Sequence, residues 1–167
     1  SIDVGDVTMN DMKTVFPFGN TLVTLEVTGT ELLEALEVAT FITPDALGAF
    51  PQVAGIEFTV DTTVPFTQGE QYTNSTYYAP LNPGSRVTIA TVGGEAFDPD
   101  AVYTICTNNF TAAGGDTYGA FAYAYQQTGY DTYKALEDAL VDYVTEVLGG
   151  VIAVPYDAPQ SRITILQ

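Results

Sequence analysis

The strongest constraint on the fold is a strand pattern that passes directly into a helix pattern within residues 21–39. The segment TLVTLEV, residues 21–27, alternates apolar and polar side chains with the period of a half-buried strand. In the next segment, TGTELLEALEVA, Thr28 or Thr30 is the N-cap, and Glu31 stands three residues after Thr28 as in a capping box. Apolar residues then recur at helical spacing, at Leu32, Leu33, Leu36 and Ala39. This pattern predicts a helix that buries one face beside a sheet.

The rest of the chain continues the alternation of helix and strand patterns. A short helix is predicted after Thr8, which has Asp11 three residues on. A further helix is predicted from Asp116 through AFAYAYQQ, and another in TYKALEDALVDYVTEVL, residues 132–148. Strands are predicted in VAGIEFTVD, in RVTIATV and AVYTICTN on either side of a tight Gly-Gly turn, and in RITIL. The order favours an α+β domain with helices packed on a mixed β-sheet.

Length and charge restrict the class of protein. The chain has 167 residues, 46% of them hydrophobic, which is enough for one domain with its own core. Four basic residues face 21 acidic ones, so the chain has no basic stripe that could neutralise phosphates. Binding to a nucleic acid polymer or to an anionic membrane surface is therefore not expected. No apolar run approaches the length of a membrane span.

The counts of cysteine and histidine exclude several kinds of structural and catalytic site. A single cysteine excludes an internal disulfide framework, and Cys106, in a strand-like run, is expected to be a small buried apolar residue. The absence of histidine removes His-bearing triads, imidazole bases and the usual zinc sites. We therefore expect neither a histidine-based catalytic residue nor a zinc site of the usual kind in this chain.

The segment NNFTAAGGDTY, residues 108–118, allows two interpretations from its chemistry alone. In the first, Phe110 is a core aromatic, the glycines form a turn and Asp116 is the N-cap of the following helix. In the second, Phe110 lies on the face of a planar ligand and Asp116 accepts hydrogen bonds from vicinal hydroxyls, as a ribose would offer. Both remain open at this point.

Several motifs together resemble a known family. The segments VFPFGNTLVTLEVTGTELLEALE, FPQVAGIEFTVD, PGSRV and NNFTAAGGDTY occur in the order and at spacings similar to those in the C-terminal domain of the 5'-nucleotidase family. The resemblance covers nearly the whole chain. It implies that residues 1–167 are a substrate-recognition domain and that a separate N-terminal domain, absent here, carries two divalent metal ions and performs hydrolysis. The fragment alone is expected to bind no cofactor and to be inactive. Its opening without an initiator Met is what we expect of a piece of a longer, exported precursor.

The resemblance also assigns roles to individual residues. Phe50 of AFPQVAG and Phe110 of NNF resemble the two rings that enclose the base, and Asp116 of GGD resembles the ribose-binding acid. A departure lies at Thr117, where the family usually has glycine. The same segment adds Asn109, Gly114 and Gly115 to the expected substrate-binding residues.

Two other motifs are expected to be structural. PFGN, residues 17–20, is read as a turn that packs against the sheet, with Phe16, Phe18 and Asn20 as scaffold. Arg86 in PGSRV is read as half of a structural ion pair rather than as a phosphate ligand.

The expected function is nucleoside recognition within a 5'-nucleotidase that hydrolyses nucleoside 5'-phosphates. The expected partners are a nucleoside or nucleotide and the protein's own N-terminal metallophosphoesterase domain, and the implied location is extracellular, cell-surface or periplasmic. Two alternatives stay open. One is a UDP-sugar or cyclic-nucleotide phosphohydrolase of the same family. The other is a non-catalytic extracellular interaction module, which the acidic, Tyr-rich insertion at residues 62–84 favours.

Overall fold

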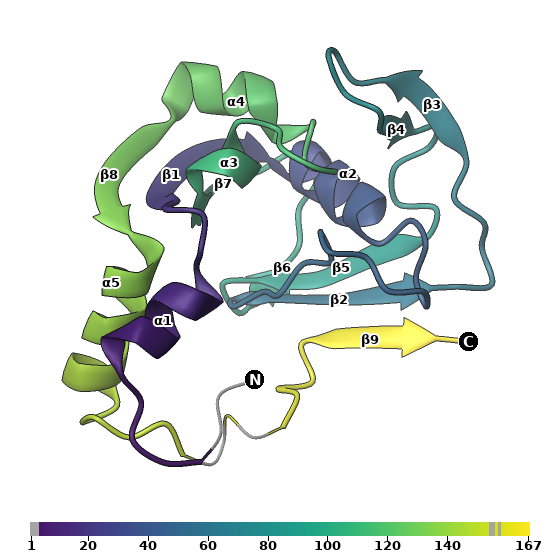
Figure 1. The fold of residues 1–167 in the computed structure, drawn as a ribbon. Helices are drawn as coiled ribbons and strands as arrows, with labels where there is room; N and C mark the ends of the chain where they lie inside the picture. The colour runs from purple at the N-terminus through teal and green to yellow at the C-terminus, as the bar shows by residue number, and fades with distance from the viewer. Residues whose placement is uncertain (1–3, 154–155, 157) are drawn as a thin grey trace.

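The residues that the structure describes form three sheets. The computed structural model describes residues 4–153, 156 and 158–167. The first sheet is antiparallel with the order β7-β1-β8, and the second has the order β6-β5-β2-β9, in which β9 runs parallel to β2 and makes the sheet mixed. The third is a small hairpin. The strand bounds are β1 Thr21–Thr28, β2 Ile56–Asp61, β3 Gln68–Gln71, β4 Tyr78–Pro80, β5 Val87–Val92, β6 Glu95–Ala96, β7 Val102–Asn108, β8 Tyr130–Ala135 and β9 Ile163–Leu166. The predicted α+β class is confirmed (Figure 1).

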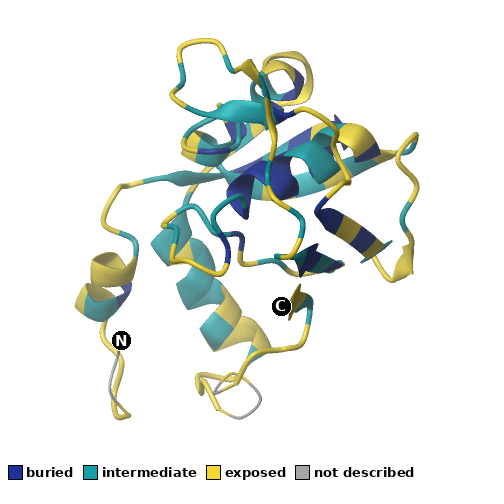
Figure 2. Ribbon diagram, turned by 90° about the vertical axis from the view of Figure 1, so that its right-hand side faces the viewer, coloured by how far each residue is buried: buried dark blue, intermediate teal, exposed yellow. Residues whose placement is uncertain are grey.

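Helix α2, Gly29–Ala39, lies between the two larger sheets and contacts β1 and β5 (Figure 1). Its capping box is confirmed with Thr28 as the N-cap: the Thr28 side chain accepts from the Glu31 amide, and the Glu31 carboxylate accepts from the Thr28 amide at 2.8 Å. Figure 2 shows the buried residues concentrated on this helix and the adjoining strands. The core joins one face of α2 to both sheets, through Val23, Leu25, Val27, Leu32, Ala35, Leu36, Phe58, Val60, Val87 and Ile89.

The predicted pairing across the Gly-Gly turn is wrong. Gly93 and Gly94 do turn the chain, both with positive φ, but the strand that pairs with β5 across this turn is the two-residue β6. Strand β7 crosses to the other sheet and pairs with β1 over its whole length, from Leu22↔Asn108 to Thr28↔Val102. The alternating pattern of β7 predicts a strand but carries no information about its partner, which tertiary packing decides.

Both helix predictions in the second half begin too early. Helix α4 is Phe121–Thr128, so Asp116 is not its N-cap; Asp116 has φ +50, outside the helical region. Residues 130–135 form β8 on the edge of β1, and α5 starts at Leu136, ends at Asp142 and continues as a π-helical turn, Tyr143–Val147. No residue of α5 is buried, in contrast to the buried stripe of α2.

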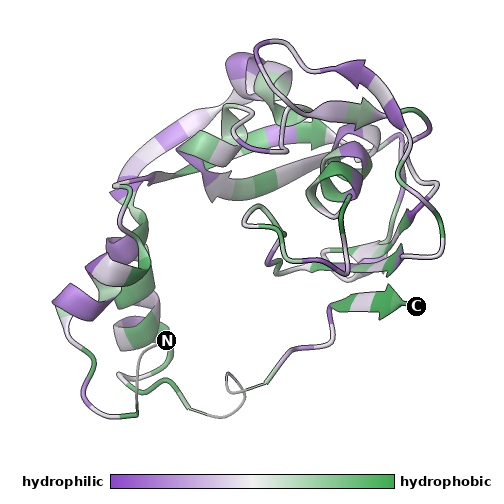
Figure 3. Cartoon of the chain, turned by 45° about the vertical axis from the view of Figure 1, so that its right-hand side comes forward, coloured by the Kyte–Doolittle hydropathy of each residue, from purple (hydrophilic) through white to green (hydrophobic). Residues whose placement is uncertain are grey.

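Helix α1, Met9–Val15, confirms the predicted capping box between Thr8 and Asp11. It contacts α5, and the two helices lie together at one side of the domain (Figures 1 and 3). Among the described residues, no helix is long and apolar enough to span a bilayer.

The insertion at residues 62–84 is a packed part of the fold. Its hairpin β3–β4 follows Phe66, whose ring meets Phe41 edge-on at 5.7 Å. The Tyr72 hydroxyl donates to Glu34 Oε1 of α2 at 2.6 Å. A Cβ placed on Gly119 would lie 2.4 Å from the Tyr72 ring, so this glycine is required for the ring to lie against the backbone.

Arg86 is structural, but the predicted ion pair is wrong. Its buried guanidinium donates to the carbonyl oxygens of Val64, at 3.1 Å, and Thr43. Within the described part of the chain, the salt bridge that forms is between Lys134 and Asp142, and Arg86 has no part in it. Burial lowers the pKa of Arg86, although the nearby Glu37 carboxylate opposes this effect. Because Arg86 is enclosed and engaged by carbonyl groups, it is not available to a phosphate.

Candidate functional site

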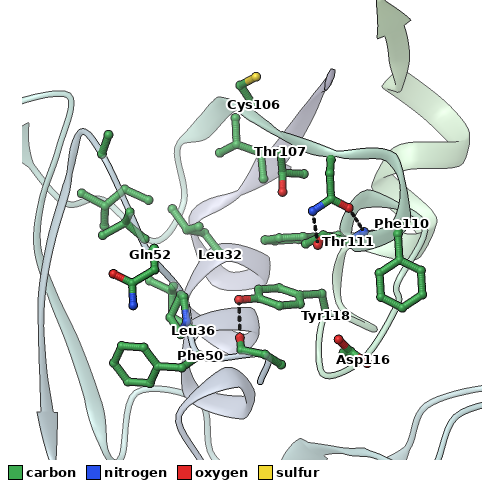
Figure 4. A pocket seen from close by; sticks show the side chains of 18 of the residues that line it. Leu32, Leu36, Phe50, Gln52, Cys106, Thr107, Phe110, Thr111, Asp116 and Tyr118 are labelled. Carbon is green, nitrogen blue, oxygen red and sulfur yellow. Dashed lines mark hydrogen bonds between the residues drawn. The ribbon is translucent and has the colours of Figure 1, made fainter. Parts of the chain in front are cut away.

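Phe50, Phe110 and Asp116 line one cavity of about 1210 Å³. The cavity is bounded by the loop after α2, by residues 104–108 of β7 and by the turns that follow α3, Asn109–Ala112. Leu32 and Leu36 of α2 form part of its floor, and Figure 4 shows Phe50 and Phe110 on opposite sides with Tyr118 between them. The predicted site is therefore assembled from segments far apart in the sequence.

The Phe110 wall is built locally. Asn108 caps α3 by accepting from the Thr111 amide at 2.8 Å, and the Gly115 amide donates to the Phe110 carbonyl at 2.9 Å. A Cβ on Gly115 would lie 2.5 Å from two atoms of the Phe110 ring, so the ring rests directly on the backbone of Gly115. Phe110 is 50% exposed, so its interpretation as a core aromatic is wrong.

Gly114, the first of the two glycines, is required for a different reason. Gly114 has φ +89, a region that L-residues avoid, and its Cβ would lie 2.9 Å from that of Ala122 in α4. The backbone then reaches Asp116 in the left-handed region, with φ +50, which Asp tolerates better than most residues. Asp116 is exposed, and Figure 4 shows its carboxyl group below the Phe110 ring.

Phe50 lies in the loop between α2 and β2. It is half-buried, and its amide donates to the Leu47 carbonyl at 3.0 Å. The neighbouring Ala49 carbonyl accepts a hydrogen bond from the Tyr118 hydroxyl at 2.8 Å (Figure 4). The described ring contacts do not include a stacked or edge-on pair between Phe50 and Phe110, and both residues line the cavity.

The other predicted residues lie beside the cavity. Asn109, Gly114 and Gly115 are not among its lining residues. The Asn109 side chain accepts from the Thr21 amide at 3.2 Å and so joins α3 to β1. These three residues support the wall that carries Phe110.

Two structural expectations fail at this cavity. Cys106 is exposed, because the period-two pattern of β7 places it on the face opposite Ile105, and it is among the lining residues. Phe18, expected to pack against the sheet, is 85% exposed and lies with Phe16 and Asn20 along the cavity. The PFGN turn is therefore part of the site's rim.

Sequence reasoning also missed lining residues that carry polar groups. Tyr118 stands two residues after Asp116, within the quoted motif, and could have been found there. Gln52 stands two residues after Phe50, is exposed and lines the cavity. Burial, with the Asp116 charge adding to it, raises the pKa of Tyr118, so its hydroxyl remains protonated and donates to Ala49.

The electrostatics of the cavity are simple. Asp116 is its only charged lining residue within the described part of the chain, and neither Lys nor Arg reaches it. Nor does any group of three or more His, Cys, Asp or Glu residues, among those described, lie close enough together to hold a metal ion. The arrangement suits an uncharged, flat molecule that offers hydroxyl groups to a carboxylate.

Comparison with known proteins decides the family. Residues 1–123 match the family model described as "5'-nucleotidase, C-terminal domain". The chain belongs to this family. This 5'-nucleotidase C-terminal domain is 38% identical over 146 residues to the trifunctional nucleotide phosphoesterase protein YfkN of Bacillus subtilis, covering 83% of this chain and 9% of that protein. It is 31% identical over 142 residues to a 5'-nucleotidase of Vibrio cholerae, covering 84% of this chain and 22% of the relative.

Solved structures agree with the family. The fold matches that of a 5'-nucleotidase precursor from Thermus thermophilus with a TM-score of 0.76 and 28% identity, over 96% of this chain and 28% of that one. It matches the NAD nucleotidase of Haemophilus influenzae with a TM-score of 0.64 and 25% identity, over 88% of this chain and 26% of the other. The 5'-nucleotidase C-terminal domain thus spans less than a third of the length of these relatives.

Proposed function

We propose that this domain binds the nucleoside part of a nucleotide for a phosphohydrolase of the 5'-nucleotidase type. The base lies between Phe50 and Phe110, and Asp116 accepts hydrogen bonds from the ribose hydroxyls. One observation carries the proposal: both rings and this single carboxylate line the same cavity, which has no other charged group among the described residues. A nucleoside matches that composition, because its base is flat and its sugar presents two neighbouring hydroxyls.

The expected affinity of the domain alone is modest. Base stacking on an aromatic ring contributes about 1–3 kcal/mol, so two rings give about 2–6 kcal/mol before ordering costs. That range corresponds to dissociation constants from tens of millimolar to tens of micromolar. Tighter binding needs contacts from outside this chain.

The phosphate of the substrate is expected to be bound outside this domain. The cavity offers no cation among the described residues, and a phosphate needs one, so we place the phosphate contacts and the two divalent ions of the family in a further N-terminal metallophosphoesterase domain. Residues 1–167 then form the substrate-recognition domain, inactive alone and secreted, at the cell surface or in the periplasm. The same nucleoside grip would serve a UDP-sugar or a cyclic nucleotide, so substrate choice among them depends on the rest of the protein.

The proposal is tested by titrating the ¹⁵N-labelled domain with AMP and adenosine. We expect weak, saturable shifts at the amides of residues 50, 110 and 116, and Phe110→Ala should abolish them. Tyr123→Ala is the matched control, since Tyr123 is 68% exposed on α4 and does not line the cavity. A spectrum that stays unchanged at tens of millimolar adenosine would refute nucleoside binding and would favour the interaction module. The domain with added Mn²⁺ should release no phosphate from AMP above buffer.

A further inference from the structure

The loop that carries Phe50 has few ties to the rest of the domain. At its start the Arg86 guanidinium donates to the Thr43 carbonyl, and at its end Pro51 is buried and Val53 packs against the core. Within residues 46–54, the described structure contains one hydrogen bond to another element, from the Tyr118 hydroxyl to the Ala49 carbonyl at 2.8 Å. The accepting carbonyl belongs to the residue directly before Phe50.

Tyr118 is itself firmly held on the opposite wall. Its ring stacks on Phe121 at a centroid distance of 5.7 Å and an interplanar angle of 28°, and Phe121 is a core residue. Its amide donates to the Gly115 carbonyl at 3.1 Å, within the turn that supports Phe110. The hydroxyl therefore connects the segment bearing Phe110 and Asp116 to the loop bearing Phe50 (Figure 4).

We propose that Tyr118 is a positioning residue that sets the separation of the two rings, an inference that rests on the nucleoside site proposed above. A base between two rings needs ring planes about 7–8 Å apart, twice the separation of carbon atoms in contact. A gap wider by only about 0.5–1 Å on one side forfeits roughly a quarter to a half of the attraction at that face. A single bond at Ala49 is therefore enough to decide whether both rings contact the base or only one does.

The first test is Tyr118→Phe, which keeps the ring on Phe121 and removes only the hydroxyl. Loss of one hydrogen bond should weaken adenosine binding about twofold to tenfold. In a Phe50→Ala background the same substitution should produce no further loss, because the ring it positions is gone. Equal losses in both backgrounds would overturn the proposal, since Tyr118 would then act on the whole site and not through Phe50.

A matched control removes a tyrosine hydroxyl elsewhere. The Tyr103 hydroxyl bonds the backbone of Asp98, and Tyr103 does not line the cavity. Tyr103→Phe should therefore leave adenosine affinity unchanged. If it weakened binding as much as Tyr118→Phe, the effect would be general loosening of the fold and the positioning role would be refuted.

A second measurement needs no ligand. In the ¹⁵N heteronuclear NOE of the free domain, Tyr118→Phe should lower the values of residues 47–50 and leave those of residues 109–115 unchanged. Unchanged NOE values at residues 47–50 would refute the proposal that the Tyr118 hydroxyl holds this loop. If wild-type protein binds no adenosine, the proposed function fails, and the relaxation data alone decide whether Tyr118 holds the loop.

Discussion

Gly115 provides the most direct test of how the Phe110 wall works. The substitution Gly115→Ala places a Cβ 2.5 Å from two atoms of the Phe110 ring and 2.7 Å from a third. Carbon atoms in contact lie about 3.5–4.0 Å apart, so the ring has to retreat by about 1 Å or more. Phe110 is 50% exposed, and its ring can turn into solvent without opening the core. The φ of Gly115 is not positive, so alanine brings no backbone strain at this position.

The expected result is a loss of binding with little loss of stability. Removing the stack on one ring costs about 1–3 kcal/mol, which weakens adenosine binding by roughly 5-fold to 150-fold. Isothermal titration calorimetry or NMR titration measures the affinity, and thermal unfolding measures the stability.

Gly114→Ala is the contrasting variant. Its φ of +89 is unfavourable for alanine, and the new Cβ lies 2.9 Å from the Ala122 Cβ of α4, where neither side can turn away. We expect it to destabilise the fold by about 1–3 kcal/mol, or roughly 2–4 °C in Tm per kcal/mol. Wild-type affinity in Gly115→Ala, or a Tm loss as large as that of Gly114→Ala, would refute the reasoning that Gly115 serves the position of the Phe110 ring.

Two further predictions concern carboxylates outside the cavity. Glu37 is fully buried, and its carboxylate accepts from the Gly84 amide at 2.7 Å and from the Ser85 hydroxyl at 2.8 Å. Glu37→Gln would turn an amide NH₂ toward one of these donors, so it should lower the free energy of unfolding by about 1–3 kcal/mol. Chemical denaturation measures this loss, and an unchanged midpoint would contradict the prediction. Hydrogen bonds from Thr8 lower the pKa of Asp11 below its ordinary value of 3.8, so the cap of α1 should contribute fully above that pH and be lost as the pH falls through the lower pKa of the folded state. NMR titration of the Asp11 carboxyl should show this low midpoint, and a midpoint at or above 3.8 would contradict it.

The parts of the fold that sequence predicts well are those fixed by near neighbours. The capping boxes at Thr8 and Thr28 each involve a carboxylate three residues on, and both are present in the structure. The predicted start of α4 is wrong because Asp116 has a positive φ and residues 115–121 form turns, through the bonds from the Tyr118 amide to Gly115 and from the Phe121 amide to Tyr118. The predicted start of α5 is also wrong, because the first residues of the predicted helix form strand β8.

In that second case a helical pattern is overridden by pairing with a neighbouring strand. The Thr132 hydroxyl donates to the Leu22 carbonyl at 2.7 Å, and Asp131 accepts from the Thr21 hydroxyl at 2.9 Å. These contacts lie more than a hundred residues apart in the chain. No local pattern in residues 130–135 could reveal them.

The candidate site also has one part fixed by near neighbours in the sequence and one part fixed by distant residues. Its Phe110 wall depends on hydrogen bonds within residues 108–118, so one quoted segment of sequence contains almost everything needed to build it. Its Phe50 wall depends on a bond between Tyr118 and Ala49, 69 positions apart, and on the burial of Pro51. A change in the length or composition of the loop at residues 41–52 should therefore move Phe50 while Phe110 and Asp116 keep their geometry. Because the stacking energy depends steeply on the gap between the rings, base affinity should vary with that loop more than ribose recognition does.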